Sequence, residues 1–199
     1  MEAISASNER IRKLPTSSRS VRHENRSALL RRWRLKHAGA LEDPRLVNRW
    51  FPGQRDLLEM LDVLSLEEVE RIADCGAPLF TVPLRCTDFS LEACASYSLT
   101  DAFEQECVEE SFLALSARLD SVRTCMQQGC LIFSLTYTEA AWLSSFCPQE
   151  LHLLARDPSM VLTPAASSEY FIAAAARSLS TVERTLLGSV SNRHAALMN

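Results

Sequence analysis

Cysteine and histidine are the residue types in this sequence that could act as nucleophile, base or metal ligand. Cys147 and His152 are the one such pair that lies close in sequence, but side chains five positions apart on a helix do not face each other well. The seven cysteines form no CxxC pair, and Cys125 and Cys130 have a poor spacing for a zinc site. Glycine-rich phosphate loops, HExxH and GxSxG are lacking. We therefore expect a protein that is not an enzyme and holds neither metal nor cofactor.

The charged side chains carry a clearer signal. Residues 1–50 hold twelve Lys or Arg against five acids, whereas residues 51–150 hold five bases against seventeen acids. A basic arm beside an acidic body suits an anionic partner, with nucleic acid first, and the alternative for residues 1–25 is a solvated, disordered tail. Guanidinium groups along a helix can neutralise phosphates without reading sequence. The candidate DNA-binding residues are Arg31, Arg32, Arg34, Lys36, Arg45 and Arg49.

A second charged group lies on the segment 66–75. Its acids would repel phosphate, so we do not expect this helix to enter a DNA groove. An acidic face suits a basic protein partner better. The candidate partner-binding residues are Glu67, Glu68, Glu70 and Asp74.

Composition sets the broad class. The apolar fraction of 47% and charged fraction of 23% are typical of a globular protein. No apolar run approaches the roughly 18–20 residues that span a bilayer, and the first residues lack a secretory signal. We expect a cytoplasmic protein that does not enter the membrane.

Helical periodicity predicts the elements that would position these charges. We expect helices from about Ser27, over 54–64 and over 65–75, the last opened by a capping box of Ser65 and Glu68. Residues 79–82 read as a short strand. Helices over 139–146, from Pro148 and over 167–188 complete the second half of the chain.

The longest predicted helix starts near 98–101 and carries a seam of apolar residues at spacings of three and four. This seam packs either inside its own domain, which we favour because the flanking positions are not cleanly charged, or across a subunit or repeat boundary. Its residues are Val108, Phe112, Leu115, Leu119, Val122 and Met126.

The same order of signals, a helix start, a helix stop and a short apolar run, occurs twice in the sequence. A shift of 82 positions aligns residues 51–98 with 133–180, with nine of 48 pairs identical, and places Leu30 on Phe112 and Trp33 on Leu115. This pattern indicates a tandem duplication of about 80 residues. The alternative is two unrelated helical stretches with ordinary capping. We expect a basic disordered arm over 1–25, a first unit over 26–98, a second unit over 99–188 and a frayed tail over 189–199.

Each unit resembles FlhD, the helical subunit of the flagellar master transcription activator. The first copy runs from RLVNRWF through LDVLSLEEVERIADCGAPLF, and the second from FLALSARLDSVRTCMQQGCLIFSL through WLSSFCPQELHLLARDPSMVL. The resemblance covers residues 27–98 and 109–180. It implies a mostly α-helical fold, each unit holding a long helix, two shorter helices and a short extended segment.

The resemblance also implies a role in transcription. FlhD proteins form homodimers that act with FlhC to bind promoters and recruit RNA polymerase, and relatives on mobile elements control transfer genes. FlhD-like proteins normally have one unit, so this chain could fold as its own pseudo-dimer. We therefore expect a transcriptional regulator subunit that binds promoter DNA with an FlhC-like partner. The alternative is a protein-binding adapter or anti-activator without direct DNA contact.

Overall fold

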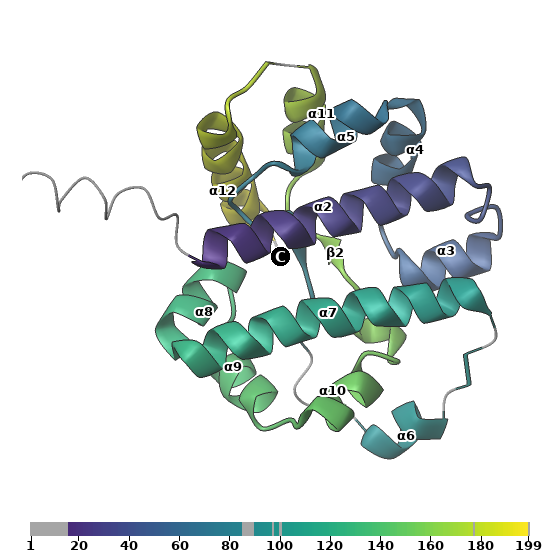
Figure 1. The fold of residues 1–199 in the computed structure, drawn as a ribbon, viewed down its shortest axis with the longest axis vertical. Helices are drawn as coiled ribbons and strands as arrows, with labels where there is room; N and C mark the ends of the chain where they lie inside the picture. Colours follow the sequence, from purple (N-terminus) through teal and green to yellow (C-terminus); the bar gives the residue numbers. More distant parts are fainter. Residues whose placement is uncertain (1–15, 85–89, 97, 100, 177, 199) are drawn as a thin grey trace, which may run out of the picture.

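Two long helices lie across the molecule, and shorter helices pack on each of them (Figure 1). The computed structural model describes residues 16–84, 90–96, 98–99, 101–176 and 178–198. The first half contains α2 (Thr16–His37), α3 (Pro44–Trp50), α4 (Arg55–Val63) and α5 (Leu66–Ala73). The second half contains α7 (Ala102–Thr124), α8 (Met126–Phe133), α9 (Tyr137–Ser144) and α10 (Pro148–Leu154). The mostly α fold class is confirmed.

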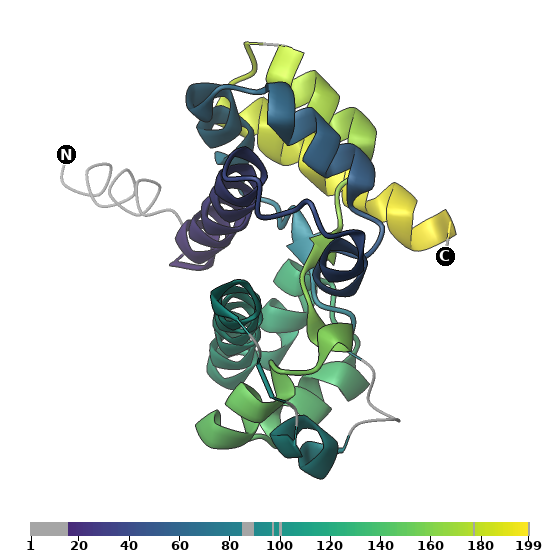
Figure 2. The same ribbon diagram turned by 90° about the vertical axis from the view of Figure 1, so that its right-hand side faces the viewer.

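The remaining elements connect the halves. They are β1 (Phe80–Thr81), α6 (Leu91–Ser96), the 3-10 turn η1 (Pro158–Met160), β2 (Thr163–Pro164), α11 (Ser168–Ala176) and α12 (Thr181–Met198). After β1 the chain crosses over, so that α6 packs on α10 of the second half, and after β2 it crosses back, so that α11 packs on α5 of the first half. Figure 2 shows the resulting two lobes, with α2 and α7 facing each other between them.

The start of each short helix follows from a local sequence signal. Ser65 caps α5: its Oγ accepts from the Glu68 N–H at 3.3 Å, and the Glu68 carboxylate accepts from the Ser65 N–H at 2.8 Å. Thr136 and Glu139 make the same capping box at α9. The Thr136 Oγ1 accepts from the Glu139 N–H at 3.2 Å, and the Glu139 carboxylate accepts from the Thr136 N–H at 2.7 Å. Pro44 and Pro148 occupy the first position of α3 and α10, where a missing N–H costs no hydrogen bond.

The two strands lie at the centre of the molecule. They pair antiparallel, with Thr81 opposite Thr163 and Phe80 opposite Pro164. Thr163 is 82 positions after Thr81, so the strands meet at the pair of residues that the 82-residue shift relates. A pairing in which one residue faces its own equivalent is what a two-fold relation between the halves requires.

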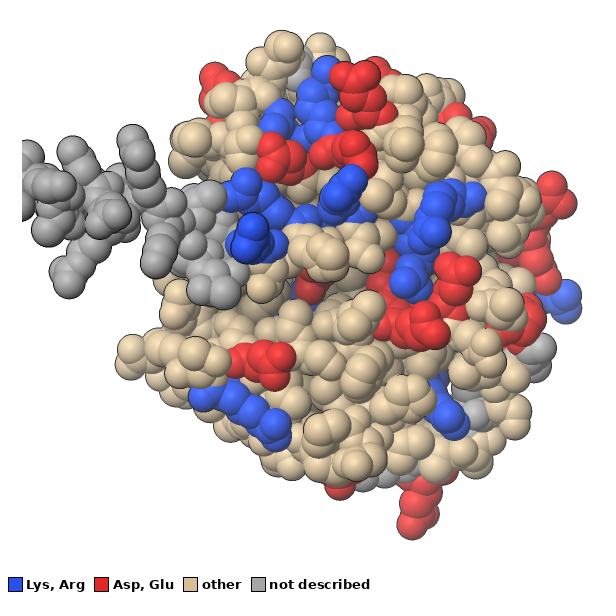
Figure 3. All heavy atoms as spheres, in the orientation of Figure 1, with Lys and Arg blue, Asp and Glu red and all other residues tan. Residues whose placement is uncertain are grey.

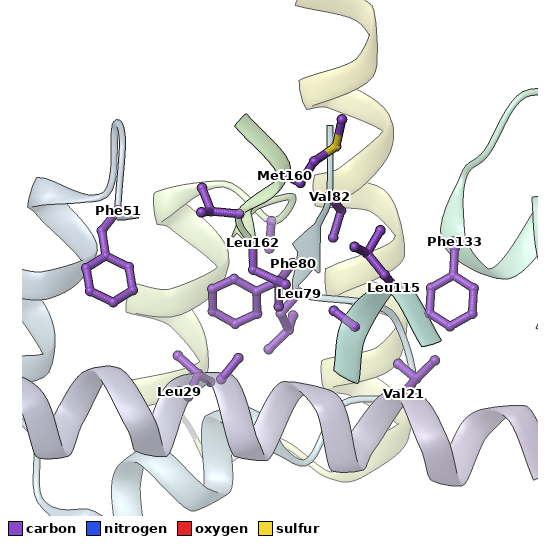
Figure 4. Packing of buried hydrophobic residues seen from close by; sticks show 14 of the residues in the cluster. Val21, Leu29, Phe51, Leu79, Phe80, Val82, Leu115, Phe133, Met160 and Leu162 are labelled. Carbon is purple, nitrogen blue, oxygen red and sulfur yellow. The ribbon is translucent and has the colours of Figure 1, made fainter. Parts of the chain in front are cut away.

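One apolar core runs through both halves. Figure 4 shows Leu29 of α2, Leu115 of α7, Phe51, Phe133 and the strand residue Phe80 within it. Leu29, Phe80 and Leu115 are fully buried. Burying a Leu or Phe side chain contributes about 1.5–3 kcal/mol, so the strand segment between the halves stabilises both of them at once.

Several expected boundaries were wrong. Helix α2 begins at Thr16, so residues 16–25 are helical and not a disordered arm, while residues 1–15 lie outside the described part of the chain. The expected frayed tail belongs to α12, which continues to Met198, and the single helix expected over 167–188 is divided into α11 and α12. The seam helix ends at Thr124 because the backbone of Cys125 is extended, and Met126 begins α8. Each half has three short helices after the long one, not two.

Among the described residues, no helix combines the length and apolar character needed to cross a bilayer.

Candidate interaction sites at the junction of the two halves

A buried arginine from each long helix joins the halves. Arg32 of α2 is fully buried, and its Nη1 donates to both carboxylate oxygens of Glu110 on α7 at 2.9 and 3.0 Å. Its Nη2 donates to the Leu162 carbonyl at 3.1 Å, and its Nε to Gln54 at 2.8 Å. The guanidinium therefore ties together α2, α7 and the segment that leads into β2.

Arg118 of α7 makes the reciprocal set of contacts. It is also fully buried, and its two terminal nitrogens donate to the Glu24 carboxylate of α2 at 2.8 and 3.1 Å. Its Nη2 also donates to the Phe80 carbonyl at 3.2 Å. The guanidinium carbon of Arg118 lies 4.6 Å from the centre of the Phe133 ring, as that of Arg32 lies 4.8 Å from the Phe51 ring.

These contacts correspond residue by residue. Arg118 follows Arg32 by 86 positions, and Glu110 follows Glu24 by the same number. Leu162 and Phe133 follow Phe80 and Phe51 by 82. The difference of four arises between the long helix and the next one. Six residues join α2 to α3 but Cys125 alone joins α7 to α8, and α7 ends one residue later than the position that corresponds to His37. The alignment of Leu30 on Phe112 and Trp33 on Leu115 was therefore wrong by one helical turn.

Sequence reasoning missed Glu24, Glu110 and Arg118. A signal was present, because both long helices carry a Glu eight residues before a buried Arg. Arg118 moreover lies between Leu115 and Leu119 of the apolar seam, where a charged side chain requires a partner. Only a comparison of the helices with a shift of 86 would have paired these residues.

A groove lies beside this junction, between α2 and α7. It has a volume of about 1040 Å³ and opens on the face shown in Figure 3. Residues 19–28 of α2 and 110–124 of α7 form its walls, and Phe133 and Leu162 contribute to its lining. Leu113 on its wall is 58% exposed. A smaller pocket of about 280 Å³ lies between α4 and α11.

The candidate DNA-binding cluster is not a continuous free surface. Arg31 is 8% exposed and donates to the Glu106 carbonyl, and Arg32 is fully buried, so neither can reach a phosphate. These two assignments were wrong because the apolar spacing alone does not reveal which arginines face inward.

The other four bases of the cluster remain nearer the surface. Arg34 is exposed. Lys36 pairs with Asp62 at 3.8 Å, Arg45 with Asp43 at 3.1 Å and Arg49 with Glu104 at 3.6 Å. The Arg45 side chain is 92% exposed, so its pair with Asp43 would not prevent a phosphate contact. Figure 3 shows blue and red side chains interleaved over α2 and its neighbours, not a uniform basic stripe.

Most of the acids on α5 and at its C-terminal end make ion pairs or hydrogen bonds within the chain. Glu70 pairs with Arg26 of α2, and Glu68 serves the capping box. Asp74 pairs with Arg184 of α12 at 2.8 Å and with Arg22 of α2 at 3.5 Å. Glu67 is exposed. Three of the four candidate partner-binding residues therefore stabilise this half of the molecule.

Asp74 is the titratable group at the point where α2, α5 and α12 meet. Burial raises its pKa, but hydrogen bonds from Thr181 and Arg184 and the charges of Arg184 and Arg22 outweigh that effect, so its pKa lies below the usual value. The ionised form is therefore favoured by the folded protein.

The apolar seam of α7 lies inside the chain. Val108, Leu115, Leu119 and Val122 are buried, and Phe112 and Met126 are partly buried against the same core. The helix packs on α8, α9 and α10 of its own half, as α2 packs on α4 and α5. The seam thus forms the core of the second half, which was the favoured alternative.

Three side chains with potentially reactive groups pack inside the molecule or against other rings. The His152 ring packs edge-on against Phe112, with centroids 5.5 Å apart. Burial raises the pKa of the Cys107 thiol and of the Tyr170 hydroxyl, so both groups stay protonated. No group of three or more His, Cys, Asp or Glu among the described residues could hold a metal ion.

A scan of protein-family models found no match to the chain, and neither the curated proteins nor the solved structures gave a significant match.

Proposed function

We propose that the chain is a non-enzymatic subunit of a transcriptional regulator, built from two FlhD-like units that fold as an intrachain pseudo-dimer. The observation that carries this proposal is the reciprocal pair of buried contacts, Arg32 with Glu110 and Arg118 with Glu24. In a homodimer with two-fold symmetry, each contact between subunits occurs twice with the roles exchanged. Here the repeated contact occurs within one chain.

The FlhD resemblance supports the regulatory role. FlhD proteins work as homodimers, and a chain with two such units would supply both halves itself. The resemblance covers residues 27–98 and 109–180, and within them segments 44–80 and 126–162 form matching short helices and lead into the paired strands. Agreement between a sequence pattern and the arrangement of the elements favours one origin for the two halves.

The regulator would act on promoter DNA together with an FlhC-like partner and would bring RNA polymerase to the promoter. Arg34, Lys36, Arg45 and Arg49 at the end of α2 and on α3 are the residues proposed to contact phosphate. The pairs of Lys36 with Asp62 and of Arg45 with Asp43 lie at the surface and are weak, because surface ion pairs contribute only about 0–1 kcal/mol, and a phosphate can replace the acid. The partner of Arg49, Glu104, is buried, so Arg49 is the most firmly held of the four.

A second candidate is an adapter or anti-activator that binds a regulator and does not touch DNA. The observation in its favour is the internal use of the basic residues. Six of them on α2 and α3 pair with acids that lie after residue 50, namely Arg22, Arg26, Arg31, Arg32, Lys36 and Arg49. Much of the basic charge of residues 1–50 therefore neutralises the acidic body.

A salt series of promoter-binding measurements separates the two candidates. The full chain is mixed with a purified FlhC-like protein, and the shift of promoter DNA is measured from about 50 to 200 mM salt. Each phosphate contact adds close to one to the negative slope of log K against log salt. We expect Arg34→Ala with Arg45→Ala to reduce that slope by about two and to weaken binding uniformly across sequences.

Arg55→Ala is the matched control, because it removes an exposed positive charge outside the proposed contact. An unchanged slope in the Arg34/Arg45 variant, with the complex intact, would exclude contact through these arginines and favour the adapter. If no complex with the partner forms at all, the proposed regulator role is wrong.

A further inference from the structure

Among the described residues, the two sides of the α2–α7 junction differ: one side forms the groove, and the other is bridged by a side chain. On that side Arg31 of α2 reaches across to α7, where it donates to the Glu106 carbonyl and lies 3.8 Å from Glu110. The residue of α7 that corresponds to Arg31 by the shift of 86 is Ala117. Ala117 lines the groove, and its methyl group cannot span the gap to α2.

Two further exchanges widen the opening. Leu30 and Leu35 of α2 correspond to Ser116 and Ser121 of α7, and both serines line the groove. At these three positions the side chains of α7 are smaller than those of α2. This face of α7 is therefore open, whereas the corresponding face of α2 is filled by its own larger side chains. The groove is therefore a difference between two otherwise matching halves.

The shape of the groove selects its occupant. Its α7 wall runs from Glu110 to Thr124, which corresponds to about 21 Å of helix. A volume of about 1040 Å³ spread over that length gives a mean cross-section of about 50 Å². A compact metabolite does not need such a long slot, whereas a row of side chains from one face of a helix fits it.

The lining also fits a helix. Small residues, including Ser27 and Ala117, allow close approach of a second backbone, and the exposed Leu113 offers an apolar contact at the wall. Glu24 and Glu110 of the lining are paired with Arg118 and Arg32. The charges left on the walls are Arg19 and His23 on α2 and Asp120 on α7. Opposite charges on the two walls would fix the direction of the occupant.

We propose that this groove binds one amphipathic helix of a protein partner. The helix has a face of Ala and Leu, with carboxylates along the edge toward Arg19 and a Lys or Arg toward Asp120. Because the equivalent groove is closed by Arg31, one chain binds one such helix. This inference rests on the proposed function, for which it supplies the partner surface.

The internal correspondence supplies the variant that tests it. Ala117→Arg introduces the residue found at the closed side, and its guanidinium is expected to reach Glu24 and the Ser20 carbonyl, as Arg31 reaches Glu110 and the Glu106 carbonyl. Thr124→Trp fills the end of the groove without adding charge. Leu131→Arg adds the same charge on an exposed position outside the groove and serves as control.

The experiment uses the full chain with the photo-reactive residue benzoylphenylalanine at Ser116, expressed in its own host. We expect one crosslinked protein, whose crosslinked segment is a helix of the stated pattern. A fluorescently labelled synthetic peptide of that segment should bind the purified chain, and the fluorescence anisotropy of the peptide measures this binding. Ala117→Arg and Thr124→Trp should each weaken this binding at least tenfold, and Leu131→Arg should leave it unchanged.

Crosslinks confined to this chain or to a second copy would overturn the proposal, as would the absence of a crosslink. Peptide binding that survives both groove-filling variants would also overturn it. If the variants leave the partner complex and its promoter shift intact, this groove assignment is wrong while the proposed function stands. Circular dichroism of each variant separates loss of binding from loss of folding.

Discussion

At the scale of residues, two arginines decide how the halves meet. Removing a charge from water is costly, and a buried guanidinium is tolerated only where carboxylates and carbonyls satisfy it. Arg32 and Arg118 each find both kinds of partner on the opposite half or on the central strands. A shift of one half against the other would leave two buried charges unpaired, so the pair specifies the register more than it adds stability.

Arg32→Ala and Arg118→Ala are expected to destabilise the protein by similar amounts. Removing one partner of a buried pair costs about 3–5 kcal/mol, because the carboxylate left behind loses its nearest counter-charge. Arg32→Ala should cost somewhat more, since Glu110 and Gln54 both lose their contact. Urea denaturation measures both free energies of unfolding.

Arg55→Ala is the control for this pair of variants. The Arg55 and Glu59 side chains are exposed and four positions apart on α4, so the loss should be about 0.3–0.5 kcal/mol. A large loss for Arg32→Ala with almost none for Arg118→Ala would show that the two contacts are not equivalent.

Asp74 makes the stability of the folded protein depend on pH at the junction of α2, α5 and α12. Because the folded protein lowers its pKa, the stability that it contributes is present above the unfolded-state pKa of about 3.9. This stability is lost as the pH falls through the folded-state pKa. Asp74→Asn should therefore be less stable than the natural protein at pH 7, and the difference should narrow toward pH 3.

Thermal unfolding of both proteins between pH 7 and pH 3 measures this difference. Asp62→Asn is a suitable control, because Asp62 has a single long contact with Lys36 at 3.8 Å. The assigned role of the carboxylate would be contradicted if Asp74→Asn were less stable than the natural protein by the same amount at every pH from 7 to 3.

At the scale of elements, local signals predicted more than long-range ones. The capping box of Ser65 and the starts at Asp101 and Pro148 follow from neighbouring residues, and the structure has them. The start of α2 at Thr16 was missed because residues 16–25 show no long apolar stripe. Tertiary contacts replace that stripe: Asn25 is buried and donates to the Cys75 and Ala77 carbonyls at 3.0 and 2.9 Å.

The turn between α7 and α8 depends on a glycine. A Cβ at Gly129 would lie 2.7 Å from Val122 Cγ1 and 2.9 Å from the Val122 backbone. We expect Gly129→Ala to destabilise the protein by about 1–3 kcal/mol, the usual effect of overpacking. Val122→Ala should not rescue it, because the backbone contact remains, and urea denaturation of the single and double variants tests this.

Gln127→Ala, an exposed change in the same helix, should alter the free energy of unfolding by no more than about 0.5 kcal/mol. If Gly129→Ala proves equally neutral, α8 can move away from α7, and the close approach is not required.

At the scale of the whole molecule, the two halves share the order of one long and three short helices and differ in the side chains at their junction. The correspondence between the halves could be predicted from the sequence from residue 51 onward, where the shift is constant at 82. It was misaligned in the long helices because the shorter α7–α8 connection changes the shift by four. The groove could not be predicted, since it depends on which side of the junction Arg31 and Ala117 face.

The central claim is that one chain supplies both halves of a dimer-like fold. Multi-angle light scattering of the purified full chain, across a wide range of concentration and without a partner, tests this claim most directly. We predict a single species with the monomer mass of 22.3 kDa. A stable species of twice that mass at every concentration would contradict the intrachain pseudo-dimer.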